Sequence, residues 1–163
     1  MVTSVNIEPK QRQADTFLGS RSLAMYRCIG CAKCSNVIRG REFVHPGTGL
    51  RGHYMCTSKY VIYALVCPCG YVYIGETAQM VKSRISQHKS SINLGNDRLP
   101  VSKHFIDMGH NADQLKFIVL EGIPPLKYGS NQELKLKQRE VWWIHNTIAP
   151  NGLNRDYDLY LFL

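Results

Sequence analysis

Two short apolar segments that carry tyrosine constrain the fold of this chain more than any other feature. The first contains Val61-Ile62-Tyr63, and Tyr73-Ile74-Gly75 follows after nine intervening residues. Runs of β-branched and aromatic residues with a Cys67-Pro68-Cys69-Gly70 turn between them predict a hairpin of strands over 60–66 and 71–76. Because side chains alternate along a strand, the two tyrosines share one face if the pairing register is even.

The pattern downstream of the hairpin predicts three helices and a further strand. Helices are expected over about 77–93, 100–108 and 131–148, and a strand over 115–120. The residues placed to cap the first and last helices are Thr77 and either Ser130 or Asn131. These elements predict an α+β domain.

Three regions are expected along the chain. Residues 1–26 are polar, lack sustained periodicity and are interpreted as a flexible N-terminal segment. Residues 27–59 are rich in Cys, Gly and Arg and have little capacity for a core, so a stapling metal is expected there. Residues 60–163 have the pattern of a compact domain.

The net charge of +8 is concentrated in the first two regions. Residues 1–59 hold nine Lys and Arg against three Asp and Glu, whereas residues 60–163 hold eleven against nine. A basic flank attracts phosphate backbones, although the solvated surface of a soluble protein accounts for the same charge equally well. The residues predicted to contact DNA are Arg27, Lys33, Arg39, Arg41, Arg51 and Lys59.

Neither a membrane partner nor secretion is expected. No apolar run is long enough to span a bilayer, and the first twenty residues lack the apolar core of a secretory signal. A reducing nuclear or cytosolic setting is therefore the expectation, and in that setting six cysteines favour metal binding over disulfides.

The first candidate zinc site is a set of four thiolates in residues 27–59. Three cysteines repeat the C-x-x-C interval and a fourth follows downstream, which suits one structural Zn²⁺. The four are Cys28, Cys31, Cys34 and Cys56. Two alternatives stay open: His45 or His53 replaces one thiolate, or one or two of the cysteines are free thiols. A redox pair is disfavoured because no thioredoxin-like βαβ pattern surrounds them.

The second candidate zinc site joins the hairpin turn to the short helix. Cys67 and Cys69 lie in the turn, His104 lies in the helix, and His110 lies just past its end. Two thiolates and two imidazoles form a closed tetrahedral set for Zn²⁺. The alternative is a pair of small buried thiols with surface histidines.

Arg84, Glu140 and the tyrosines supply the groups that phosphodiester hydrolysis requires. The arginine fork matches phosphate oxygens, and one carboxylate with waters and substrate oxygens suffices to hold Mg²⁺. Each residue taken alone also has a plainer explanation: strand tyrosines pack, a helix arginine is solvated, and Glu140 pairs with Arg139 or Lys137.

As an ordered set these residues resemble the GIY-YIG nuclease superfamily. The resemblance covers residues 60–155, and it departs from the family pattern at Val61, where the motif has glycine. It implies a small three-stranded antiparallel sheet flanked by helices, preceded here by the zinc-stapled basic module. The motif residues are Ile62-Tyr63, Tyr73-Ile74-Gly75, Arg84, His88, Glu140 and Asn154.

The resemblance also implies roles in catalysis. Tyr63 would be the general base or would orient the water, and Tyr73 would position the water or the phosphate. Arg84 would stabilise the scissile phosphate, and Glu140 would hold a single Mg²⁺ or Mn²⁺. The residues that would support the site through hydrogen bonds are His88 and Asn154. Whether Tyr63 or His88 takes the proton stays open.

The cysteines between the tyrosine motifs and the histidines after them are similar to the endonuclease of Penelope-like retroelements. That resemblance implies a nuclear enzyme that nicks DNA and leaves a 3′ hydroxyl to prime reverse transcription. The implied partners are DNA, a reverse transcriptase in the same polyprotein and its RNA. The alternative function is a non-catalytic, zinc-dependent nucleic-acid-binding module.

Overall fold

A three-stranded antiparallel sheet forms the centre of the molecule. The computed structural model describes residues 24–38, 52–126, 131–147 and 152–154. The strands are β3 (Val61–Val66), β4 (Val72–Thr77) and β5 (Lys116–Gly122), in the order β4-β3-β5. The sheet and the helices around it confirm the α+β prediction.

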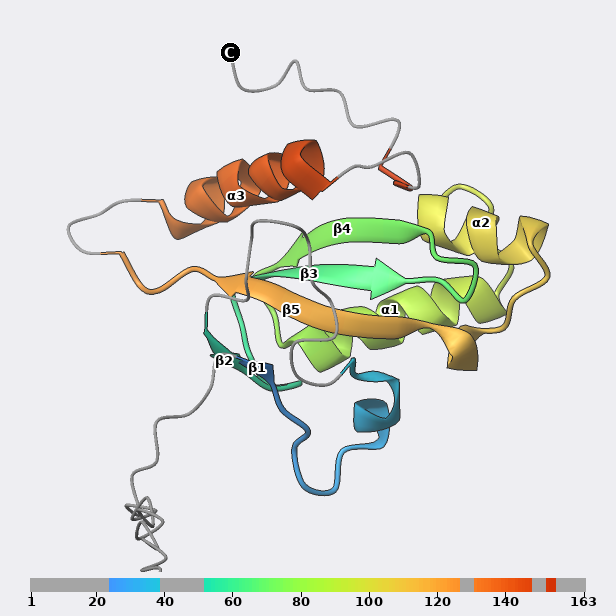
Figure 1. The fold of residues 1–163 in the computed structure, drawn as a ribbon, viewed down its shortest axis with the longest axis horizontal. Coiled ribbons are helices and arrows are strands. Elements are labelled where there is room, and N and C mark those ends of the chain that lie inside the picture. The colour runs from blue at the N-terminus through green and yellow to red at the C-terminus, as the bar shows by residue number, and fades with distance from the viewer. Residues whose placement is uncertain (1–23, 39–51, 127–130, 148–151, 155–163) are drawn as a thin grey trace, which may run out of the picture.

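Three helices surround the sheet. Helix α1 (Val81–Asn93) and helix α3 (Gln132–Thr147) cover opposite faces, and α2 (Pro100–Asp107) lies near the turn of the β3–β4 hairpin (Figure 1). Because both faces are covered, neighbouring side chains of β3 are buried alike: Ile62 and Tyr63 are each 0 % exposed.

The strand register places both motif tyrosines on the face that α1 covers. Tyr63 pairs with Gly75, and Leu65 pairs with Tyr73, so the register is even and the two tyrosines share a face as predicted. On the other side of β3, Ile62 pairs with Glu121, which therefore points to the α3 face.

The first helix begins later than predicted, and Thr77 is not its cap. Helix α1 starts at Val81, and its N-cap residue, Met80, makes no side-chain cap hydrogen bond. Thr77 instead ends β4, and its Oγ1 accepts a hydrogen bond from the N–H of Gln79 in the following turn. Asn131 does cap α3, because its Oδ1 accepts from the N–H of Leu134.

The described part of the Cys-rich region packs into the same core as the sheet. Strand β1 (Ala24–Met25) pairs in parallel with β2 (His53–Tyr54), and the 3-10 helix η1 (Ala32–Asn36) lies between them in sequence. Met25 of β1, which precedes this region, also enters the common core. The side chains that the region itself contributes are Cys34, Val37, Tyr54 and Cys56. Ala24 and Met25 were expected to be flexible; residues 1–23 lie outside the described residues.

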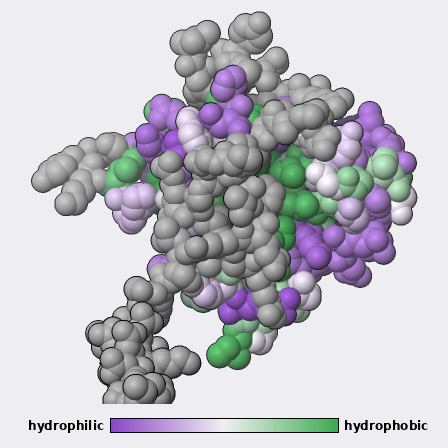
Figure 2. All heavy atoms as spheres, viewed as in Figure 1, coloured by the Kyte–Doolittle hydropathy of each residue, from purple (hydrophilic) through white to green (hydrophobic). Residues whose placement is uncertain are grey.

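Within the described ranges, no helix combines the length and the apolar character needed to cross a bilayer. Hydrophilic side chains predominate over the end of the molecule that carries α2 (Figure 2).

Candidate active site and metal centres

A hydrogen-bonded group of three side chains lies where β3 meets α1. Tyr63 Oη lies 2.8 Å from Nε2 of His88, and Arg84 Nε donates to the same Oη over 3.3 Å. Because the guanidinium can only donate, the phenol oxygen accepts from it and its own hydrogen is free to point at the imidazole. Arg84 and His88 reach the phenol together since they are four residues apart on one helix face.

Gly75 is the residue that lets the two tyrosine rings come together. A Cβ placed there would lie 2.6 Å from Tyr63 Oη and 2.9 Å from Cε1 of Tyr73. Neither distance is compatible with a side chain, so any larger residue would displace the rings. Both rings in turn lie edge-on to His88, with centroid separations of 5.9 Å for Tyr63 and 5.8 Å for Tyr73.

Burial sets the protonation state of the group. Burial and the neighbouring Tyr73 raise the pKa of Tyr63 well above its ordinary value, and Arg84 opposes only part of that change. Burial, reinforced by the charge of Arg84, lowers the pKa of His88 to about 4. At neutral pH the group therefore holds a neutral phenol, a neutral imidazole and one fixed positive charge.

Glu140 approaches the tyrosines from α3. Its side chain is buried, and its negative charge raises the pKa of both Tyr63 and Tyr73, in each case adding to the larger effect of burial. Its neighbour Arg139 donates from Nε and Nη2 to Glu121 Oε2, at 2.9 and 2.7 Å. Glu140 is thus a buried carboxylate whose charge acts on both phenols.

A cavity of about 360 Å³ lies between α1 and α3 at the end of β4. Arg84 and Gln87 line it from α1, and Glu133 and Lys137 line it from α3. Arg84 also borders a second cavity of about 100 Å³, beside Tyr73 and His88. Arg84 therefore lines both cavities.

Glu140 is the carboxylate that the sequence predicts to hold Mg²⁺ or Mn²⁺. Among the described residues, Glu140 belongs to no cluster of three or more ligating side chains. A divalent ion that keeps several waters and uses substrate oxygens fits such a site, whereas an ion that needs an all-protein cage does not.

Asn154 acts on the edge of the sheet rather than on the phenols. Its Oδ1 accepts from the N–H of Ile74 at 2.9 Å, and its Nδ2 donates to the carbonyl of the same residue at 2.8 Å. Leu153 N–H donates to the carbonyl of Val72 in the same way. These bonds fix the main chain between Tyr73 and Gly75.

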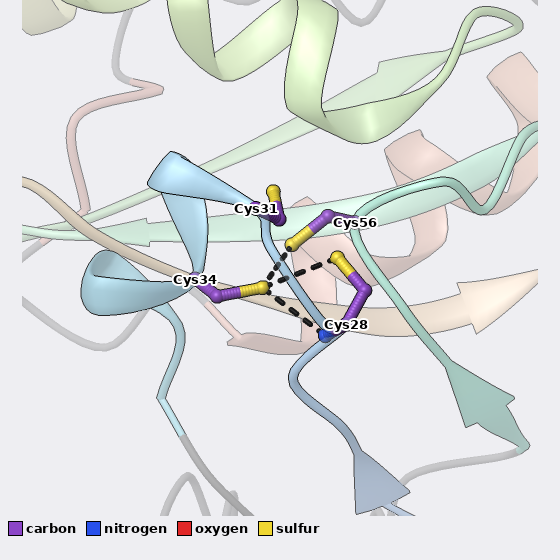
Figure 3. A group of neighbouring side chains, drawn as sticks. All are labelled: Cys28, Cys31, Cys34 and Cys56. Carbon is purple, nitrogen blue, oxygen red and sulfur yellow. Dashed lines mark hydrogen bonds between the residues drawn. The ribbon is translucent and has the colours of Figure 1, made fainter.

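The four cysteines of the first candidate zinc site converge, and we call this group the tetrathiolate cluster. Their Sγ atoms all lie within 4.8 Å of one another. Cys34 Sγ lies 3.3 Å from Cys28 Sγ and 3.1 Å from Cys56 Sγ (Figure 3). All are free cysteines, and these separations exceed the disulfide length of about 2.05 Å.

The donor set of the tetrathiolate cluster fits Zn²⁺. Burial, together with Cys34 and Cys28, raises the pKa of the Cys56 thiol, so a thiolate forms there only beside a cation. The N–H of Cys28 already donates to Cys34 Sγ over 3.2 Å. His53 is exposed and outside the cluster, and His45 lies outside the described residues.

The second candidate zinc site also converges, and we call it the hairpin-tip site. The ligand atoms of Cys67, Cys69, His104 and His110 lie within 4.8 Å of one another. His104 Nε2 is 3.1 Å from Cys69 Sγ and 3.2 Å from Cys67 Sγ. Among the described residues, His110 Nε2 is buried without a hydrogen-bond partner, and a Zn²⁺ ion would satisfy a nitrogen of this kind.

The predicted DNA contacts are only partly described. Arg27 and Lys59 are exposed and Lys33 is half-buried, and none of the three lies in the group around Tyr63. The predicted contacts that lie outside the described residues are Arg39, Arg41 and Arg51.

Sequence reasoning missed two residues that hold the site. Gln87 Oε1 accepts from Arg84 Nη1 over 2.9 Å, and its spacing of three residues from Arg84 was the available signal. Glu121 fixes α3 by accepting from Arg139 and from Trp143 Nε1, the latter over 2.7 Å. No local pattern marks that role, since the contact joins a strand to a helix far along the chain.

Comparison with known protein families identifies the family to which the chain belongs. The family model described as the GIY-YIG catalytic domain matches residues 59–143, which is more than half of the chain. The chain belongs to the GIY-YIG family and is an endonuclease whose substrate is DNA and whose activity depends on metal. Comparisons with curated proteins and with solved structures found no match. Asn154 and the tetrathiolate cluster lie outside the matched residues.

Proposed function

We propose that this endonuclease nicks DNA by hydrolysing one phosphodiester at the group formed by Tyr63, Arg84 and His88. The observation that carries the proposal is the position of Tyr63 Oη, between Arg84 Nε at 3.3 Å and His88 Nε2 at 2.8 Å. One hydrogen-bonded unit thus holds Tyr63 as the general base, Arg84 as the cation and His88 as the acceptor of the Tyr63 proton.

The geometry supports a definite order of proton movement. Arg84 binds the scissile phosphate, and Tyr73 orients the water against it. Tyr63 Oη takes a proton from the attacking water while its own proton passes to His88 Nε2, and the water oxygen bonds to phosphorus. The bond from phosphorus to the 3′ oxygen breaks, and that oxygen takes a proton from solvent. A divalent ion at Glu140, when bound, supplies charge that stabilises the leaving oxygen.

A plasmid nicking assay with Mg²⁺ or Mn²⁺ tests this proposal. Arg84→Ala and Glu140→Ala should each abolish relaxation of supercoiled plasmid, because one loses the phosphate contact and the other the ion. Arg98→Ala is the matched control, since Arg98 is an exposed arginine outside both cavities. Equal relaxation by all variants would mean a contaminant or a wrong site. Binding without relaxation by the wild type would favour the non-catalytic alternative.

We further propose that the nick primes reverse transcription for a retroelement. Support comes from the Cys67, Cys69, His104 and His110 set, which is similar to that of Penelope-like endonucleases and whose ligand atoms converge. The proposed setting is the nucleus, with a reverse transcriptase of the same polyprotein and its RNA as partners. A polymerase should extend the nicked strand directly. Extension only after phosphatase treatment would contradict a free 3′ hydroxyl.

The basic side chains of the Cys-rich region are proposed to bind the DNA backbone. Arg27 and Lys59 are exposed, which leaves their charges available to phosphates. Replacing either by alanine should lower the salt dependence of binding by about one counterion, measured as the slope of log affinity against log salt. An unchanged slope would place the DNA elsewhere.

A further inference from the structure

The N-terminus of α1, the helix that carries Arg84 and His88, is capped by the main chain of the Cys-rich region. The N–H of Val81 donates to the carbonyl of Ser58, and the N–H of Lys82 donates to the carbonyl of Cys56, both at 2.9 Å. The first N–H groups of a helix have no partner within it, and Met80 supplies no side-chain cap. These two carbonyls therefore take the place of a cap.

Cys56 joins this cap directly to the tetrathiolate cluster. Its side chain is 0 % exposed, and its Sγ lies 3.1 Å from Cys34 Sγ, while its carbonyl holds Lys82. A single residue thus carries a ligand atom at one end and a helix contact at the other. Arg84 follows Lys82 by two residues, so a shift of the cap would change the position of Arg84 within the same helical turn.

A second attachment holds the cluster to the same helix further along. Asn36, two residues after Cys34, is buried, and its Nδ2 donates to the carbonyls of Asp113 and Leu115, each at 2.8 Å. Its Oδ1 accepts from Lys89 Nζ over 2.9 Å, and Lys89 is the neighbour of His88. Cys56 of the cluster and the nearby Asn36 therefore contact α1 on either side of Arg84 and His88.

The outer edge of β5 provides a rigid base for these contacts. Ile38 N–H donates to the carbonyl of Phe117 at 2.9 Å, and Val119 N–H donates to Met25 Sδ at 3.2 Å. The segments on either side of η1 are thereby tied to the sheet that holds Tyr63. Movement of the cluster relative to Tyr63 is restricted, so the cluster can define where α1 begins.

We propose that the tetrathiolate cluster is a positioning device for the active site, with Cys56 and Ser58 as its positioning residues. With Zn²⁺ bound, the cluster fixes two carbonyls against the start of α1 and so sets Arg84 and His88 against Tyr63. This inference rests on the proposed roles of those three residues. It differs from a DNA anchor, which would change binding rather than the rate of the bound complex.

The central experiment compares two ligand variants that remove one thiolate each. Cys31→Ser tests the tetrathiolate cluster through a ligand that is only partly buried, and Cys69→Ser is the matched control in the hairpin-tip site. Three quantities are measured on the full chain: bound zinc, hydrogen exchange at the amides of Val81 and Lys82, and single-turnover nicking at saturating DNA.

Cys31→Ser should lose one zinc equivalent, speed exchange at both amides about tenfold and slow saturated nicking about tenfold or more. Its affinity for DNA should stay within about twofold of the wild type. Cys69→Ser should leave the two amides unchanged. Cys31→His, which keeps a zinc ligand, should restore exchange, zinc and rate together.

Loss of the zinc with unchanged exchange and an unchanged saturated rate would overturn the proposal. A change in DNA affinity alone would also overturn it and favour the anchor. If the wild type fails to nick DNA, the proposed function fails, whereas the exchange measurement still decides whether the cluster holds α1.

Ser58→Ala provides a second variant that leaves every thiolate in place. Ser58 Oγ accepts from the N–H of Met55 over 3.0 Å, which shapes the loop that presents the Ser58 carbonyl. This variant should keep its zinc and show a smaller increase in exchange at Val81, with a proportionate loss of rate. Unchanged exchange at Val81 would contradict the assigned role of this loop, even if Cys31→Ser fails to fold.

Discussion

In both candidate zinc sites the four ligand atoms lie within 4.8 Å of one another, but the two sites occupy different places in the fold. In the tetrathiolate cluster Cys34 and Cys56 are buried, and the main chain of Cys56 holds the catalytic helix. In the hairpin-tip site Cys69 is exposed, and the ligands join the β3–β4 turn to α2. The first site is therefore expected to govern the nuclease core, and the second to govern one end of the sheet.

The largest expected effect distinguishes the two sites by stability. Cys56→Ser should lower the free energy of unfolding by about 3 to 5 kcal/mol, because it removes a fully buried ligand at the junction with α1. Cys69→Ser should cost about 1 to 2 kcal/mol, because Cys69 itself is exposed to solvent. Denaturant unfolding at equal zinc concentration measures both. A larger loss for Cys69→Ser would reverse the comparison.

Lowering the pH should destabilise the fold by protonating His88 on α1, independently of either zinc site. The pKa of His88 is about 4 in the fold, against about 6.5 in an unfolded chain. The neutral form is favoured by folding, so this stability is present above pH 6.5 and is lost as the pH falls toward 4. The loss should reach about 3 kcal/mol.

The His88→Asn variant isolates that contribution, because zinc release at low pH affects the wild type and the variant alike. Unfolding free energies of wild type and variant are compared between pH 7 and pH 4. The difference between the two curves should shrink as the pH falls. Parallel curves would contradict burial of a neutral imidazole beside Tyr63.

A substitution on β4 tests whether the phenols respond to packing while both zinc sites stay intact. Gly75→Ala places a Cβ 2.6 Å from Tyr63 Oη and should slow nicking about a hundredfold, with zinc content unchanged. Gly95→Ala is the control, because its φ of +66° is strained for alanine but its Cβ meets open space. Gly95→Ala should lose stability without losing rate; equal rates for both variants would exclude the steric argument.

Much of the fold was predictable because its signals are local. Alternation along the hairpin predicted one face for Tyr63 and Tyr73 if the register was even, as it is, and helical spacing brought Arg84 and His88 together. The motif order also indicated the family before any contact was known. In each case the residues that carry the signal are close in sequence or follow a fixed order.

The parts that could not be predicted depend on contacts between distant segments. Thr77 looked like a helix cap, but the carbonyls of Cys56 and Ser58 cap α1 from more than twenty residues upstream. No residue pattern predicts a main-chain cap, because every residue has a carbonyl that could accept the hydrogen bond. For the same reason the sequence could not show that the Cys-rich region shares the core of the nuclease.

Single-turnover nicking by Tyr63→Phe tests the central claim most directly. The substitution removes only the phenol oxygen, which lies 2.8 Å from His88 Nε2 and 3.3 Å from Arg84 Nε. With zinc content and DNA affinity matched to the wild type, the nicking rate should fall about a thousandfold. A rate equal to the wild type would show that Tyr63 does not take part in cleavage and would contradict the account.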